Sequence, residues 1–338
     1  MHSMQRTPGK PRHLHLYVGQ NPLSAHNTDL LSCISSGTTP THLTMRMVDY
    51  PREELFQDLI RAVTKNTSLV YLDISKTSLP YEASETTCLL LGEMFARNNT
   101  LLELDVSGEQ AVLESASLGK GLVSSLARIA ENTTLEVLRI ELQALGTPGA
   151  MELASLLSKN TSLRQLYCEQ NDIHLSGFTA LVNALQTNHS LIYLPDMARD
   201  RADHVRALKE KLFQNSAPPV PTASKLKKEE AHHHHPKLPS SFRRASKSKK
   251  VAFAEKGAEV ERVEQSLLLL EEKWQSETER LRGYLGRNVV EAEERRVLKA
   301  REVRGGGTTV EGAAGGAGGA AVARVLASEA YGFINFGV

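Results

Sequence analysis

Seven leucines recur at nearly constant spacing in the first 194 residues of the chain, at Leu16, Leu43, Leu72, Leu104, Leu138, Leu166 and Leu194. The successive spacings are 27, 29, 32, 34, 28 and 28 residues. A near-identical tetrapeptide, Asn-x-Ser/Thr-Leu, precedes five of them and begins at Asn66, Asn98, Asn132, Asn160 and Asn188. A tetrapeptide that recurs in phase with a leucine ladder predicts a stack of similar structural units.

One unit can be read between Leu163 and Asn188. Its first part has the apolar spacing of a short strand and a turn, at Leu163, Leu166, Cys168, Asn171 and Ile173. Its second part has leucines four residues apart, Leu181 and Leu185, as on one face of a helix. Neither part can bury its apolar face alone, so the unit is stable only when it is stacked on copies of itself.

The strand part follows the pattern L-x-x-L-x-L-x-x-N/C-x-L, with Cys168 in place of a leucine. Together with the period and the Asn-Thr-x-Leu tetrapeptide, it resembles the ribonuclease-inhibitor type of leucine-rich repeat. The resemblance covers about residues 13–213 and implies an α/β fold, a curved solenoid with a parallel sheet on its concave face and helices on its convex face. It does not imply ribonuclease inhibition, because function in such proteins depends on variable surface residues. A weaker similarity links the chain to CARMIL-like actin regulators.

Composition along the chain predicts five segments. A disordered N-terminus (1–12) precedes the solenoid (13–214), whose last helix, from Ala198 to Gln214, is expected to cap it. A linker rich in Pro, Ser, Lys and His (215–254) leads to a long amphipathic helix (255–303), and a Gly/Ala-rich disordered tail (304–338) follows. The first unit has no polar cap before it, which favours a chain cut from a longer array.

The helix predicted at 255–303 carries a seam of apolar residues at steps of three and four: Val260, Val263, Leu267, Leu270, Trp274, Leu281 and Tyr284. Such a seam is typical of a coiled coil, which would make the chain a homodimer. It equally fits a single amphipathic helix that folds back on the solenoid.

Strand alternation predicts the exposed concave face, because the neighbours of each register leucine point away from the core. The candidate partner-binding residues on this face are Tyr71, Asp73, Glu103, Asp105, Arg139, Glu141, Tyr167, Glu169 and Tyr193. Tyrosine offers a large, stiff contact area with a polar tip. An acidic strip with tyrosines at its ends would suit a partner with a basic, partly apolar surface, although the same residues could simply face water.

A second candidate site lies in the predicted linker. Lys250-Val251-Ala252-Phe253 resembles the docking motif of regulators of protein phosphatase 1, in which an extended segment places the valine and phenylalanine on one face. Arg243-Arg-Ala-Ser246 makes Ser246 a candidate phosphosite for basophilic kinases. The basic cluster at 243–250 could also serve nuclear import, or be no more than a solvated linker.

Other classes of function find no support in the sequence. The net charge of +1 gives no global field for nucleic acid or membrane, and neither is expected as a partner. Nucleophile elbows, phosphate loops and paired metal ligands are absent, so we expect no enzyme, no cofactor, no metal and no small-molecule substrate. Three scattered cysteines and the lack of a signal-like segment indicate an intracellular, cytoplasmic protein. The recurring N-x-S/T sequons are therefore interpreted as turn residues.

The sequence thus predicts a non-catalytic scaffold that binds a protein through the concave solenoid face. The first alternative is a regulatory subunit that docks protein phosphatase 1 through Val251 and Phe253. The second is an actin-regulatory, CARMIL-like protein or a basic-patch adaptor.

Overall fold

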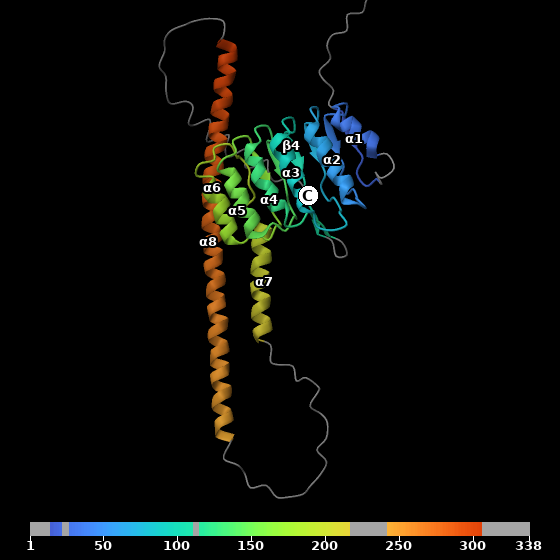
Figure 1. Ribbon diagram of the computed structural model, residues 1–338. Coiled ribbons are helices and arrows are strands. Elements are labelled where there is room, and N and C mark those ends of the chain that lie inside the picture. The colour runs from blue at the N-terminus through green and yellow to red at the C-terminus, as the bar shows by residue number, and fades with distance from the viewer. Residues whose placement is uncertain (1–13, 22–26, 111–114, 217–241, 306–338) are drawn as a thin grey trace, which may run out of the picture. The chain divides into compact units, whose positions relative to one another are not determined.

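The structure, a computed structural model, describes residues 14–21, 27–110, 115–216 and 242–305 (Figure 1). It divides into two compact units. The first contains the described residues up to Arg201 together with those from Ser276 onward, and the second spans Ala202–Gln275.

A six-stranded sheet runs through the first unit, and all its strands are parallel to their neighbours. In spatial order they are β1 (His15–Tyr17), β2 (His42–Thr44), β3 (Tyr71–Asp73), β4 (Glu103–Asp105), β7 (Val137–Arg139) and β8 (Gln165–Tyr167). Their pairing aligns the first six register leucines, from Leu16 through Leu166. The seventh repeat is joined to β8 by a single bridge between Gln165 and Tyr193. The parallel sheet and its register are confirmed.

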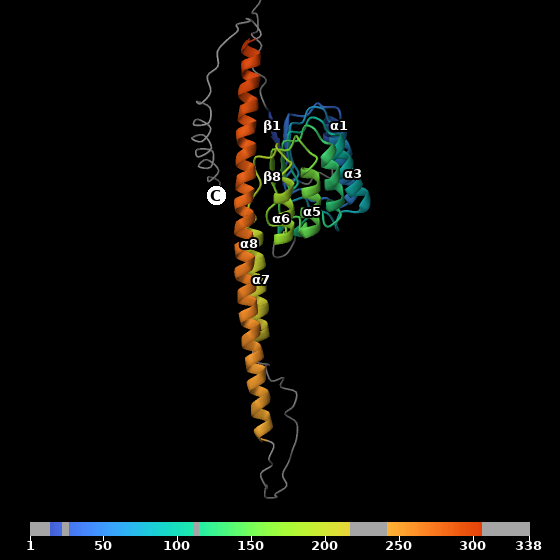
Figure 2. The same ribbon diagram turned by 90° about the vertical axis from the view of Figure 1, so that its left-hand side faces the viewer.

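A helical segment follows each strand of the sheet. These segments are α1 (Asn27–Ser35), α2 (Glu53–Lys65), α3 (Glu85–Arg97), α4 (Leu122–Leu126) with the 3₁₀ helix η2 (Ala127–Glu131), α5 (Gly146–Leu157) and α6 (Leu175–Ala184). Figure 2 shows β1 and β8 on one side of this unit and α1, α3 and α5 on the other. The apolar face of each helix and the leucine of each strand close the core between them, and Leu43, Leu72, Leu138 and Leu166 are all fully buried.

Buried asparagines join each repeat to the one before it. In the repeat that begins at Asn132, the side-chain oxygen accepts hydrogen bonds from the backbone N–H groups of Thr134 (2.8 Å) and Leu135 (2.7 Å). The side-chain nitrogen donates to the carbonyl oxygens of Phe95 (2.7 Å) and Asn98 (2.9 Å) in the preceding repeat. The same four-way arrangement recurs at Asn98, Asn160 and Asn188. We call these residues, with Asn66, the asparagine ladder. Its members are at most 6% exposed. Their side chains supply hydrogen-bond partners to buried backbone groups that would otherwise have none.

The repeat after Leu104, which has the longest spacing of 34 residues, contains a small hairpin. Its strands, β5 (Glu109–Gln110) and β6 (Ser115–Ala116), pair antiparallel, and residues 111–114 between them lie outside the described part. Lys76 of the preceding repeat forms an ion pair with Glu109, with an Nζ to Oε1 distance of 2.6 Å. The hairpin is therefore tied to the strand side of its neighbour.

Two further helices follow the sheet, α7 (Ala198–Ser216) and α8 (Phe242–Gly305). Asp200, in the first turn of α7, is 3% exposed and accepts hydrogen bonds from the backbone N–H groups of Gln170, Asn171 and Ile173. That α7 caps the array stays a prediction. α8 begins at Phe242, thirteen residues before the predicted start at 255. Residues 242–254 contain neither glycine nor proline, so nothing in them stops a helix. No helix in the described part is long and apolar enough to cross a membrane.

Part of the apolar seam of α8 packs within the first unit. Leu281 and Leu285 are at most 8% exposed. From Ser276 onward α8 belongs to the same unit as the repeats, and Arg280 and Asn288 hydrogen-bond to the last of them. The structure therefore shows a helix folded back on the array. The homodimer stays a prediction, as do the N-terminus (1–12), residues 217–241 of the linker and residues 306–338 of the tail, which lie outside the described residues.

We expect Asn132→Ala to lower the free energy of unfolding by about 3 kcal/mol, because each buried backbone group left without a partner costs about 1–3 kcal/mol. Urea unfolding followed by circular dichroism measures the change. Thr133→Ala is the matched control, since Thr133 is exposed and adjacent. Equal midpoints for the two variants would contradict a structural role for the ladder.

Candidate protein-binding face

The predicted face is made of columns of side chains that run across the strands. One column contains His15, His42, Tyr71, Glu103, Val137 and Gln165, and the next contains Tyr17, Thr44, Asp73, Asp105, Arg139 and Tyr167. The pairing register places these residues side by side as the spacing predicts, because one-residue slips are excluded once the leucines face the core. Most are half-buried among one another rather than free in solvent.

Four of the predicted residues form one continuous group. Arg139 donates from Nε to Oε1 of Glu103 at 3.2 Å. Its guanidinium carbon lies 3.9 Å from the centre of the Tyr167 ring, within the range of a cation–π interaction. The rings of Tyr167 and Tyr193 lie 4.5 Å apart, centre to centre. We call Glu103, Arg139, Tyr167 and Tyr193 the Arg–Tyr group.

Carboxylates lie near this group, and their surroundings disfavour the ionised form. The pKa of Glu141 is raised, first by burial and then by the negative charges of Asp105 and Glu169, against which Arg139 and Arg199 act. The pKa of Asp105 is also raised, again first by burial. Burial and the nearby charges raise the pKa of Tyr193 to about 12. Burial and neighbouring carboxylates together therefore make ionisation of Asp105 and Glu141 less favourable than in water.

Three predicted residues have local structural roles: Asp73, Asp105 and Glu169. Oδ1 of Asp105 accepts a hydrogen bond from the backbone N–H of Ser107 at 2.9 Å. Asp73 is 6% exposed, and its Oδ1 accepts a hydrogen bond from the backbone N–H of Ser75 at 2.9 Å. The expectation that it is exposed is therefore wrong, because the turn after β3 uses its carboxylate. Glu169 accepts a hydrogen bond from the backbone N–H of Arg199 at 2.9 Å, at the start of α7.

A cluster of histidine and tyrosine rings at the other end of the sheet was missed as a site. The ring centres of His15 and Tyr71 are 5.4 Å apart, and those of His42 and Tyr71 are 5.8 Å apart. Tyr17 stacks on His15 at 4.2 Å and is 69% exposed. Burial and the acidic neighbours Asp73, Glu103 and Asp105 raise the pKa of Tyr71 to about 12. The signal was present in the sequence, since both histidines occupy the column of Tyr71.

The phosphatase-docking and phosphorylation candidates lie on α8. Ser246, Lys250, Val251 and Phe253 belong to its helical backbone, and their side chains lie outside those described. Docking through an extended segment would require this turn of α8 to unwind. It stays a prediction.

Chemistry beyond binding finds no assembled site. Among the described residues, no group of three or more His, Cys, Asp or Glu side chains could hold a metal ion. The described cysteines, Cys33, Cys88 and Cys168, are all free thiols, and burial raises the pKa of Cys168 well above its ordinary value.

Comparison with known proteins adds little. No protein family model matches the chain. Among solved structures, it is similar to one described as "Leiomodin-1 Actin-Binding Site 2 (ABS2)". The match has 17% sequence identity and a TM-score of 0.36, and it covers 57% of this chain and 99% of the other. A likeness of this size assigns neither a partner nor a function.

We expect Asp105→Asn to raise the thermal unfolding temperature at pH 7 by about 2 °C, as about 1 kcal/mol moves it by about 2–4 °C in a domain of this size. The pKa of Asp105 is raised in the folded state, so folding favours the protonated form of this carboxyl group. The stability that this form contributes is complete at low pH and is lost as the pH rises through the raised pKa. The neutral amide avoids this loss and keeps an oxygen for the N–H of Ser107.

Thermal unfolding measured between pH 3 and pH 7 checks this prediction. The gain should vanish below about pH 3.9, the ordinary pKa of aspartate. Asp58→Asn is the control, since Asp58 is exposed and paired only with Arg61 among the contacts of the described residues. A gain that persists at low pH would contradict the electrostatic cause.

Proposed function

We propose that the chain is a leucine-rich repeat solenoid that binds a protein partner through the face carrying the Arg–Tyr group, without catalysing a reaction. The observation that supports this most is the group itself. An arginine stacked on one of two touching tyrosines, inside a ring of carboxylates, is an arrangement that folding alone does not require. Arginine and tyrosine are also the residues that contribute most often to the binding energy of interfaces.

The rigidity of this group favours binding. Arg139 is held by Glu103 on one side and by Tyr167 on the other. The hydroxyl of Tyr167 donates to Oε1 of Gln165 at 2.9 Å. Side chains that are already ordered lose little conformational entropy when a partner contacts them, so more of the contact energy appears as affinity.

The charge balance indicates the chemistry of the partner. Asp105 and Glu141 are ionised at a cost, because they are partly buried and lie near other carboxylates. A lysine or arginine brought by a partner would remove that cost and lower both pKa values. We therefore propose a partner with a basic surface that also offers apolar area to Tyr167 and Tyr193. The free cysteines fit a reducing, intracellular compartment for this encounter.

A photo-reactive benzoylphenylalanine in place of Tyr167 tests the proposal in nuclease-treated extract of the source cells. We expect a discrete protein adduct there, and none when the same group replaces Tyr81, which is 87% exposed and lies outside the columns of the face. Adding Glu141→Lys to the Tyr167 probe should reduce the adduct at least tenfold, because like charges across an interface repel.

Two outcomes would count against this function. Equal adducts from the Tyr81 and Tyr167 positions would mean that the face has no special role. An adduct that is unchanged by Glu141→Lys would mean that the partner is not recognised by its positive charge.

A further inference from the structure

The last repeat ends with two carbonyl groups that the ladder would normally use. From Asn98 onward, each asparagine side chain of the ladder donates to the carbonyl of the preceding asparagine and to that of the residue three positions before it. Asn160, for example, donates to Asn132 (2.8 Å) and Ile129 (3.0 Å). The equivalent acceptors in the last repeat are the carbonyl oxygens of Asn188 and Leu185, and no further strand–helix repeat follows in the described residues.

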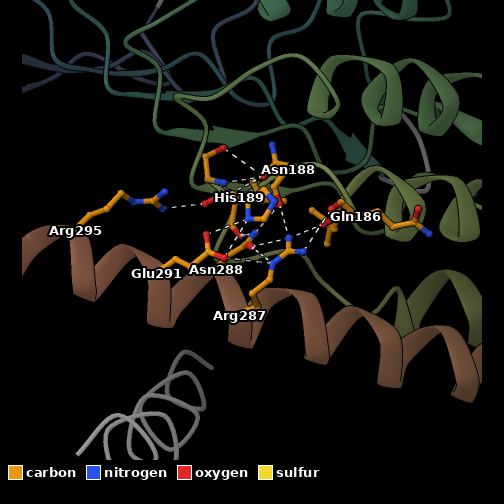
Figure 3. Close-up of polar contacts among 10 residues, drawn as sticks. Gln186, Asn188, His189, Arg287, Asn288, Glu291 and Arg295 are labelled. Atoms are coloured by element: carbon orange, nitrogen blue, oxygen red, sulfur yellow. Dashed lines mark hydrogen bonds and ion pairs between the residues drawn. The ribbon is translucent and has the colours of Figure 1, made fainter. Parts of the chain in front are cut away.

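Two adjacent residues of α8 bind these two carbonyls (Figure 3). Arg287 donates from Nη2 to the carbonyl oxygens of Leu185 at 2.7 Å and Asn188 at 2.8 Å. Asn288 donates from Nδ2 to the carbonyl oxygens of Asn188 at 3.0 Å and Leu191 at 2.7 Å. Asn288 is fully buried. A helix from 100 residues further along the chain thus supplies the donors that a next repeat would supply.

Other contacts fix the position of α8 along the repeat. Arg280 donates from Nη2 to the side-chain oxygen of Asn183 at 2.8 Å. Glu291 lies 3.0 Å from Nδ1 of His189, and Arg295 donates to the His189 carbonyl at 3.0 Å. Arg280, Arg287, Glu291 and Arg295 recur at steps of seven, four and four along α8, so they lie on one face of the helix. Leu281 and Leu285, at most 8% exposed, lie between the polar contacts.

We propose that the end of the array is a helix-binding site, that residues 276–296 of α8 occupy it as an exchangeable cap, and that the same helix of a second copy of this chain can take its place. The hydrogen bonds between α8 and the array come from α8 side chains, whereas each repeat is joined to its neighbour by strand pairing as well. Release of α8 therefore leaves the sheet intact. It exposes a row of carbonyl groups that a second copy's Arg287 and Asn288 match.

A fluorescent peptide with the sequence of residues 276–300 tests the proposal against the full chain. In the variant chain, Arg287→Ala and Asn288→Ala together weaken the binding of α8 to the end of the array. We expect the peptide to bind this variant at least tenfold more tightly than the wild-type chain, because the wild-type site is occupied and the peptide must compete with α8. A peptide that carries the same two substitutions should bind neither chain. Fluorescence anisotropy measures all four combinations.

The matched control is Arg296→Ala, which also removes an arginine from α8. Its side chain is 81% exposed and is paired with Glu293 of the same helix. This chain should bind the peptide as weakly as the wild type does. If circular dichroism shows that the double variant does not fold, Asn288→Asp alone replaces it, since aspartate keeps the size and loses the donors.

Three results would overturn the proposal. If the native peptide binds neither chain, α8 is a fixed part of the array. If the native peptide binds both chains equally, α8 does not compete for the site in the wild-type chain. If the substituted peptide binds as well as the native one, Arg287 and Asn288 are not what is recognised.

Discussion

The hydrogen bonds of the asparagine ladder are the constraint on which the rest of the structure depends. One side-chain amide accepts from two N–H groups of its own turn and donates to two carbonyls of the repeat before it. Only an amide of this length offers both roles at once, since a carboxylate only accepts and a hydroxyl has a single proton to donate. Each rung therefore fixes the shape of one turn and the distance to the previous repeat. Strand pairing and leucine packing then act on units that are already in register.

The candidate binding face is a consequence of that register. Residues about 30 positions apart in sequence become neighbours across the sheet, so Glu103, Arg139 and Tyr167 meet although nothing local joins them. Burial raises the pKa of Asp105 and of Glu141, and the same alignment adds to this by placing carboxylates of successive strands near one another. A stack of similar units thus concentrates charge of one sign unless a partner or a local arginine offsets it. This coupling links the regularity of the fold to the proposed basic partner.

The ladder also explains why the end of the array is a special place. Every repeat leaves two carbonyl groups that the asparagine of the next repeat binds. The last repeat of a stack of any length therefore ends with two carbonyl groups that no further asparagine binds. Asp200 of α7 binds the N–H groups of the last complete turn, and Arg287 and Asn288 of α8 bind the carbonyls. The N–H groups and the carbonyl groups at the end of the array thus find their partners in two different helices. One follows directly in sequence and the other comes from much further along the chain.

The sequence by itself determined the repeat, its register, the parallel sheet, the structural role of Asn66, Asn98, Asn132, Asn160 and Asn188, and the columns of the face, because all of these follow from periodic spacing. It also indicated the apolar seam of α8 but left open what that seam packs against. What part of the seam packs against became visible only in the folded chain. The folded chain also shows that the carboxylate of Asp73 binds a backbone N–H in a turn and that Arg139 stacks on Tyr167. The physical reason is that periodicity encodes which face a residue occupies, whereas the pairing of Arg287 and Asn288 with Leu185 and Asn188 depends on how two segments a hundred residues apart meet in space. No spacing rule carries that information.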